Sequence, residues 1–108
     1  MTVVDDYLRC ANVVRNQLVA PELLALWDAP SALAQWTVAG LAGHVARSVF
    51  LLPGILSAPV SDDDVPVSAV DYFASALSDA DLDVGSQMAV AIRERGLEAA
   101  GGGIEDLL

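Results

Sequence analysis

The chain has 108 residues, of which 55% are hydrophobic, and its five arginines stand against fifteen aspartates and glutamates, a formal net charge of −10. This composition suits one compact domain with a core of its own and is not that of a disordered tail. The negative charge repels phosphate backbones and anionic membrane surfaces, so we expect neither nucleic acid nor a membrane as a partner.

Cysteine content and the distribution of apolar residues indicate the compartment. A single cysteine, Cys10, cannot form an internal disulfide, which suits a reducing environment. The chain does not open with a basic segment followed by an apolar run, the pattern of a secretory leader. The most apolar stretch, 48–60, is interrupted by Pro53, Gly54 and Pro59 and is too short to span a bilayer. We therefore expect a cytoplasmic protein.

The amino-terminal third predicts one long helix and one short one. Apolar residues recur every three or four positions over 3–19, which places them on one face of a helix. Thr2 followed by Asp5 has the spacing of a capping box at the start of this helix. Pro21 ends it and suits the first position of one or two further turns over 21–27.

A second long helix is predicted to begin after Thr37, whose hydroxyl can cap it, and to run to about Leu52, where Pro53 and Gly54 stop it. Trp36, just before the cap, is predicted to pack as a hydrophobic staple against Leu41 or against the helix face at Gly40. Small side chains gather on this helix and would let another helix approach closely; they belong to Ala39, Gly40, Ala42 and Gly43.

The remaining sequence predicts a long acidic connection and more helices. The connection covers 57–68, and a short helix over 69–77 is capped by Ser68 with Asp71. Aspartates at 79, 81 and 83 are predicted at the amino end of a third long helix, which ends at 101–103. Its apolar face is predicted from Leu82, Met88, Ala89 and Ile92. Residues 104–108 have the pattern of the first turn of another helix, so the fold class is all-α.

His44 is the only histidine of the chain. On the second long helix it shares a face with Gly40, Leu41, Ser48 and Leu51, so we expect it to point inward or toward a cleft. Two interpretations stay open from the residues alone. The imidazole is a core or boundary group that bonds a carbonyl or carboxylate, or it is a metal ligand. A catalytic zinc takes about three protein ligands.

The segment around His44 has a wider resemblance. Trp36, Thr37 and Val38, followed by Leu41 and His44, resemble the signature W-T/S-V-x-x-L-x-x-H-V/L-A of the mycothiol-dependent maleylpyruvate isomerase family, in the DinB-like helical-bundle superfamily. The segments DYFASAL (71–77) and VAIRERGLEAA (90–100) resemble later parts of the amino-terminal domain of that family. The resemblance extends over about residues 3–108.

The resemblance implies a four-helix bundle with up-down-down-up order, in which 57–68 is the long crossover between the second and third helices. A single domain over 1–108 would then hold three long helices and only the start of the fourth. The family holds a divalent metal, usually zinc, with a histidine equivalent to His44 and with a Glu and a His on the fourth helix. Mycothiol serves as thiol cosubstrate, and its thiolate adds to an electron-poor double bond, permits rotation and leaves.

The resemblance also implies an incomplete metal site, since the Glu and second His of the family would lie beyond Leu108. One hypothesis is therefore a metal- and thiol-dependent isomerase or transferase domain that lacks most metal ligands, with a small-molecule thiol and an electrophilic substrate as partners of the complete protein. The alternative is a non-catalytic helical interaction module. Three long helices without a fourth would expose an apolar groove, which a homodimer or a partner would cover.

Overall fold

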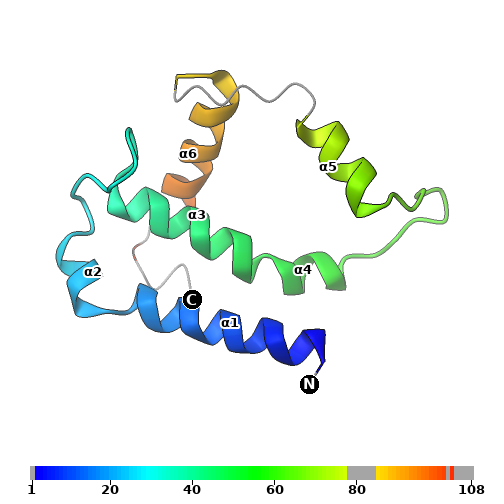
Figure 1. The fold of residues 1–108 in the computed structure, drawn as a ribbon, viewed down its shortest axis with the longest axis horizontal. Helices are drawn as coiled ribbons and strands as arrows, with labels where there is room; N and C mark the ends of the chain where they lie inside the picture. The colour runs from blue at the N-terminus through cyan, green and yellow to red at the C-terminus, as the bar shows by residue number, and fades with distance from the viewer. Residues whose placement is uncertain (1, 78–84, 102, 104–108) are drawn as a thin grey trace.

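The computed structural model describes residues 2–77, 85–101 and 103, and its regular elements in these ranges are all helices (Figure 1). The all-α prediction is therefore confirmed. The helices are α1 Val3–Leu18, α2 Pro21–Ala25, α3 Val38–Phe50, α4 Leu52–Ser57, α5 Ala69–Leu77 and α6 Gln87–Ala99.

The predicted capping box at the start of α1 is present. The Thr2 hydroxyl oxygen accepts from the Asp5 backbone N–H at 3.1 Å, and the Asp5 carboxylate accepts from the Thr2 backbone N–H at 2.9 Å. The Thr2 hydroxyl also donates to the same carboxylate at 2.8 Å. These bonds use amide groups that have no partner inside the helix.

The capping box makes the stability of α1 depend on pH. Hydrogen bonds from the Thr2 backbone and hydroxyl favour the ionised carboxylate and hold the pKa of Asp5 below its ordinary value of 3.8. A lowered pKa stabilises the helix above the ordinary value, and this contribution is lost as pH falls through the lowered pKa. We expect NMR titration of the Asp5 carboxyl to give a pKa below 3.8, and Thr2→Ala to return it toward that value. The return is expected to be partial, because alanine keeps the backbone N–H that bonds the carboxylate, and an unchanged pKa in Thr2→Ala would contradict the bond from the Thr2 hydroxyl.

Pro53 and Gly54 do not stop the helical course as the sequence predicted. α3 ends at Phe50, but α4 begins at Leu52 and continues in nearly the same direction (Figure 1). Pro53 lies in the first turn of α4, where its missing N–H costs no hydrogen bond. The prediction failed because it treated the proline as a stop and overlooked that a proline suits the start of a helix.

The same continuation changes the longest apolar stretch. Val38–Ser57 is a 20-residue helical segment with a mean hydropathy of 1.4, long and apolar enough by those measures to cross a membrane. The stretch expected from the sequence was shorter because it began at Ser48. Core helices of soluble proteins pass the same test, so one such segment does not indicate a membrane protein.

Beyond α4 the prediction is confirmed for one helix and corrected for the next. The Ser68 hydroxyl accepts from the Asp71 backbone N–H at 3.1 Å at the start of α5. α6 begins later than predicted, at Gln87, where the Ser86 hydroxyl accepts from the Ala89 N–H at 3.1 Å. Its first turn therefore holds no acidic residue. The predicted aspartates, Leu82, and the start of a further helix at 104–108 lie outside the described residues.

α3 is the centre of the packing, with α1 along one side and α6 crossing the other (Figure 1). The crossing is a contact of backbone with backbone, since a Cβ on Gly43 would overlap the Gly96 carbonyl oxygen. A Cβ on Gly96 would in turn overlap the carbonyl oxygen of Gly40. The prediction that the small residues of α3 admit a close helix is therefore confirmed.

The core follows from this arrangement. Its buried members are Leu18 of α1 and small residues of α3 and the end of α6, namely Ala39, Ala42, Ala46 and Ala100. The Tyr7 hydroxyl adds a tie between α1 and α3 by donating to the Val49 carbonyl at 2.7 Å. The Cα radius of gyration is 16.0 Å, larger than the ~13 Å of a compact domain of this size. The described helices thus form an open assembly around α3, and the up-down-down-up order of a four-helix bundle is not confirmed.

Candidate functional site

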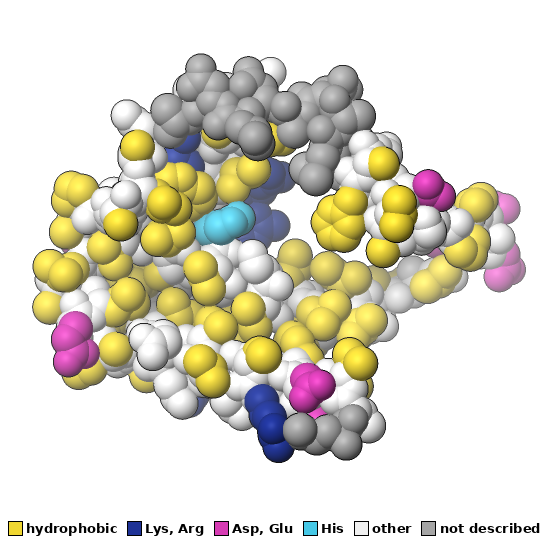
Figure 2. Space-filling model, viewed as in Figure 1, with side chains coloured by type: hydrophobic (Ala, Val, Ile, Leu, Met, Phe, Trp, Pro, Cys, Tyr) yellow, Lys and Arg dark blue, Asp and Glu magenta, His cyan; other side chains and the backbone are white. Residues whose placement is uncertain are grey.

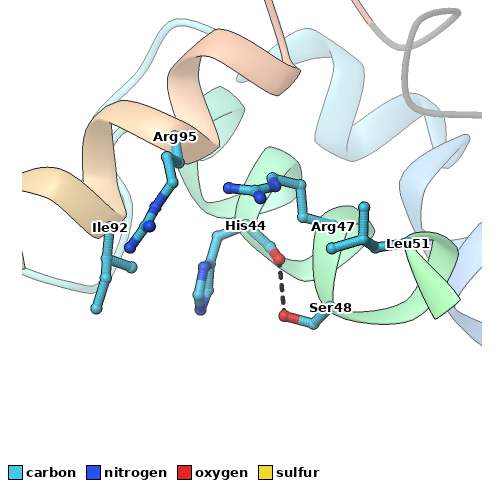
Figure 3. Close-up of a pocket in the computed structure, with 6 residues that line it drawn as sticks. All are labelled: His44, Arg47, Ser48, Leu51, Ile92 and Arg95. Carbon is cyan, nitrogen blue, oxygen red and sulfur yellow. Dashed lines mark hydrogen bonds between the residues drawn. The ribbon is translucent and has the colours of Figure 1, made fainter. Parts of the chain in front are cut away.

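A cavity of about 190 Å³ opens where α6 crosses α3 (Figure 3). His44, Arg47, Ser48 and Leu51 line it from α3, and Ile92 and Arg95 line it from α6. The single histidine is visible in a hollow of the surface, with basic side chains behind it (Figure 2). The expectation that His44 points toward a cleft, with Ser48 and Leu51 on the same face, agrees with this cavity.

The start of α3 fixes where His44 lies. The Thr37 hydroxyl accepts from the Gly40 N–H at 3.0 Å and so caps the helix as predicted. His44 then follows two turns later, on the side that α6 crosses. Farther along, the Ser48 hydroxyl donates to the His44 carbonyl oxygen at 2.9 Å (Figure 3). The imidazole is thus carried on a helix whose first turn is held by its cap.

Trp36 contacts the imidazole directly. The two ring centroids are 5.3 Å apart, with the ring planes inclined by 55°. The preceding turn directs the indole there, since Gln35 has a φ of 70° and the Trp36 carbonyl accepts from the Ser31 N–H at 2.8 Å. The sequence predicted that Trp36 packs against Leu41 or the helix face at Gly40, and it did not identify His44 as a neighbour. The indole thus lies against the imidazole, and His44 rather than Trp36 is among the residues that line the cavity.

The charge around the cavity is positive. Arg47 and Arg95 are two of only five basic residues in a chain of net charge −10, and they line the same cavity as the only histidine. No carboxylate lines it among the described residues. Glu98 belongs to a neighbouring space of about 440 Å³ that also touches both arginines. Within the described part of the chain, neither Arg47 nor Arg95 has a carboxylate oxygen within ion-pair distance.

The described residues do not fit a zinc ion. They contain no group of three or more His, Cys, Asp or Glu side chains close enough to hold a metal. His44 would be the single ligand in its cavity, whereas a catalytic zinc takes about three from the protein. The two neighbouring guanidinium groups also repel a dication. His44 as a metal ligand therefore stays a prediction, and no chemical step is derived through a metal.

A second concave surface is apolar. It has a volume of about 360 Å³ and lies between α1, α2 and α3. Leu23 lines it from α2, Val14 and Leu18 are among its residues from α1, and Leu41 and Val45 are among those from α3. The sequence predicted an apolar groove at an unfilled fourth-helix position, and whether this surface is that groove stays a prediction. Whether a second copy of the chain covers it stays a prediction.

Sequence analysis missed both arginines of the cavity. Arg47 could have been found, because it lies three residues after His44 and so on the adjacent part of the same helix face. Arg95 could not have been found, since nothing in its own segment indicates that α6 crosses α3 beside this residue. Its place depends on Gly96, the next residue, where the two backbones meet.

The fold and the cavity together define a small all-α domain with a basic, ligand-sized cavity beside a helix-borne histidine. Comparison with known families is more specific. The family model described as "mycothiol maleylpyruvate isomerase N-terminal domain" matches residues 13–100, and the chain belongs to this family. The match confirms the resemblance seen around Trp36 and His44. No curated protein and no solved structure matches the chain.

Proposed function

We propose that this chain acts as the amino-terminal domain of a mycothiol-dependent isomerase or transferase, and that the cavity beside His44 receives the small electrophilic substrate of that reaction, with the thiol reaching it from the open side. Membership in the family supports a role with mycothiol. The cavity supports the location, because it is the polar concavity of the described residues that includes the histidine of the family-like segment.

The proposed reaction is the isomerisation of an electron-poor double bond. The sulfur of the thiolate forms a C–S bond, the π electrons move toward the electron-withdrawing group, and the former double bond rotates. Loss of the thiolate then restores the double bond, so no atom or electron is gained. The chain's contribution in this scheme is to hold the substrate between α3 and α6 and to limit its contact with water.

The geometry fits a small ligand better than a large one. The volume of about 190 Å³ is below the usual range of pockets that hold drug-sized ligands. Leu51 and Ile92 offer apolar contact at the cavity, whereas the histidine and the arginines offer polar contact. This mixture suits a short, polar, unsaturated molecule.

The test is a titration of the 15N-labelled chain with mycothiol, followed by amide chemical shifts. We expect the shifts to gather on α3 around His44 and Ser48 and on α6 around Ile92 and Arg95. The S-methylated thiol and the sugar without its cysteine are the matched controls, and they separate recognition of the sulfur from recognition of the sugar. No shift on α3 and α6 at millimolar mycothiol would refute the proposal.

A further inference from the structure

We propose that Arg47 and Arg95 form an anion-binding site beside His44 that takes the carboxylate group of a small organic acid. The inference rests on the proposed function only in treating that acid as a substrate. The site itself is argued from the cavity and its charges.

The first observation is the convergence of basic groups from two helices. The Arg47 side chain extends from α3 toward α6, and the Arg95 side chain extends from α6 toward His44 (Figure 3). Like charges do not gather in this way to stabilise one another. The convergence is held by the backbone contact of Gly43 with Gly96, next to Arg95. A bound anion would turn a repulsive arrangement into an attractive one.

The second observation is that both guanidinium groups are available. Arg95 is exposed and Arg47 is half-buried, and within the described residues neither forms an ion pair. Glu98 contacts the neighbouring space, and its carboxylate does not line the cavity of His44. Each arginine therefore brings a guanidinium group, with its N–H donors, to a cavity that no carboxylate lines among the described side chains.

The third observation concerns the kind of anion. A guanidinium group presents two parallel N–H groups that match the two oxygens of a carboxylate. The cavity of about 190 Å³ is small for a nucleotide and has room for an acid of a few carbon atoms. Leu51 and Ile92 line the same cavity and suit the carbon chain of such an acid. Inorganic phosphate shares the charge, so the experiment must distinguish the two.

An ordinary explanation exists for each arginine by itself. Arg47 lies in the last turn of α3, where a cation interacts favourably with the helix dipole. Arg15 lies in the last turn of α1 and has the same explanation, but it is exposed and lines neither cavity that Arg47 lines. Arg15 is therefore the matched control for Arg47, since replacing either removes one charge from the same place in a helix.

The experiment is a titration of the 108-residue chain with maleate, a small dicarboxylate, followed by amide shifts of the 15N-labelled protein. We expect shifts around the cavity, and we expect Arg47→Gln and Arg95→Gln each to weaken the affinity about tenfold to a hundredfold, the usual effect of losing a hydrogen bond to a charged group. Arg15→Gln should change it less than about twofold, because exposed distant charges are screened. Circular dichroism checks that each variant keeps its helices.

Three results would overturn the inference. The first is an equal affinity for maleate in the original chain and in the Arg47→Gln, Arg95→Gln double variant. The second is a loss of maleate affinity in Arg15→Gln as large as in the cavity variants. The third is tighter binding of inorganic phosphate than of maleate. If a glutamine variant unfolds, Arg47→Lys and Arg95→Lys take its place in the test. They keep the positive charge and should lose only part of the affinity for maleate. Full affinity in both would refute the paired guanidinium site. Binding of maleate without any effect of mycothiol would instead refute the proposed function and leave the anion site standing.

Discussion

Gly43→Ala is expected to force α3 away from α6 and to lower the free energy of unfolding by about 2 kcal/mol or more. A Cβ at this position would overlap the Gly96 carbonyl oxygen and would lie 2.9 Å from the Gly96 carbonyl carbon. It would also lie 3.2 Å from the Ala100 Cβ, part of the core. The atoms in the way are backbone atoms, so no side-chain rotation can relieve the overlap.

The sign of this effect is opposite to that of helix propensity. Alanine in place of glycine stabilises an unhindered helix by about 1 kcal/mol, so the expected loss is what remains after this gain. Gly54 of α4 provides the matched control because a Cβ there would meet nothing within 4 Å. We expect Gly54→Ala to raise stability by about 0.4–1 kcal/mol. Urea unfolding followed by circular dichroism measures both.

The reciprocal substitution tests the same contact from α6. A Cβ on Gly96 would overlap the Gly40 carbonyl oxygen and would lie 3.3 Å from the His44 Cβ. Gly96→Ala should therefore destabilise the chain and move His44 relative to Arg95. The loss of unfolding free energy in the Gly43→Ala, Gly96→Ala double variant should be smaller than the sum of the two single losses. One separation of the helices relieves both overlaps. Equal behaviour of Gly43→Ala and Gly54→Ala would contradict the crossing.

Local signals predicted much of the secondary structure. Thr2, Thr37 and Ser68 all cap helices, as their spacing to the following residues indicated. The small residues of α3 correctly predicted a close helix neighbour. These features depend on interactions within one helical turn or on one helix face, and such interactions can be recognised in a single segment.

The features of the site that the sequence did not predict depend on tertiary contacts. The expected apolar face of α6 includes Met88, Ala89 and Ile92, which are partly buried, but the sequence did not predict that the crossing with α3 brings Gly96 against the backbone of α3. In a single sequence, a glycine inside a helix indicates only a local loss of helix stability. Its role in the close packing of two helices becomes visible only when the position of the second helix is known. The two arginines of the cavity come together through this contact. The site therefore could be predicted at His44 and not at Arg95.

Leu18→Ala is expected to lower the free energy of unfolding by about 2–4 kcal/mol, within the usual range for a buried leucine. Leu18 is 4% exposed, and the other buried members of the core are alanines. It is also the only buried residue of α1. Removing its side chain leaves α1 with only half-buried groups against α3, such as Val14 and the hydroxyl of Tyr7. A loss of this size is a large part of the 5–15 kcal/mol that stabilises a typical domain.

Leu56→Ala is the matched control, because the same atoms are removed from a side chain that is 75% exposed. It should change stability by less than about 0.5 kcal/mol. The apolar groove beside Leu18 affects the size of the main effect, since neighbours that border open space can move inward and fill part of the cavity. We therefore expect Leu18→Met, which keeps the volume, to cost less than about 1.5 kcal/mol. If Leu18→Ala were as mild as Leu56→Ala, α1 would not be docked on α3, and the groove between them would not exist as a surface of the folded chain.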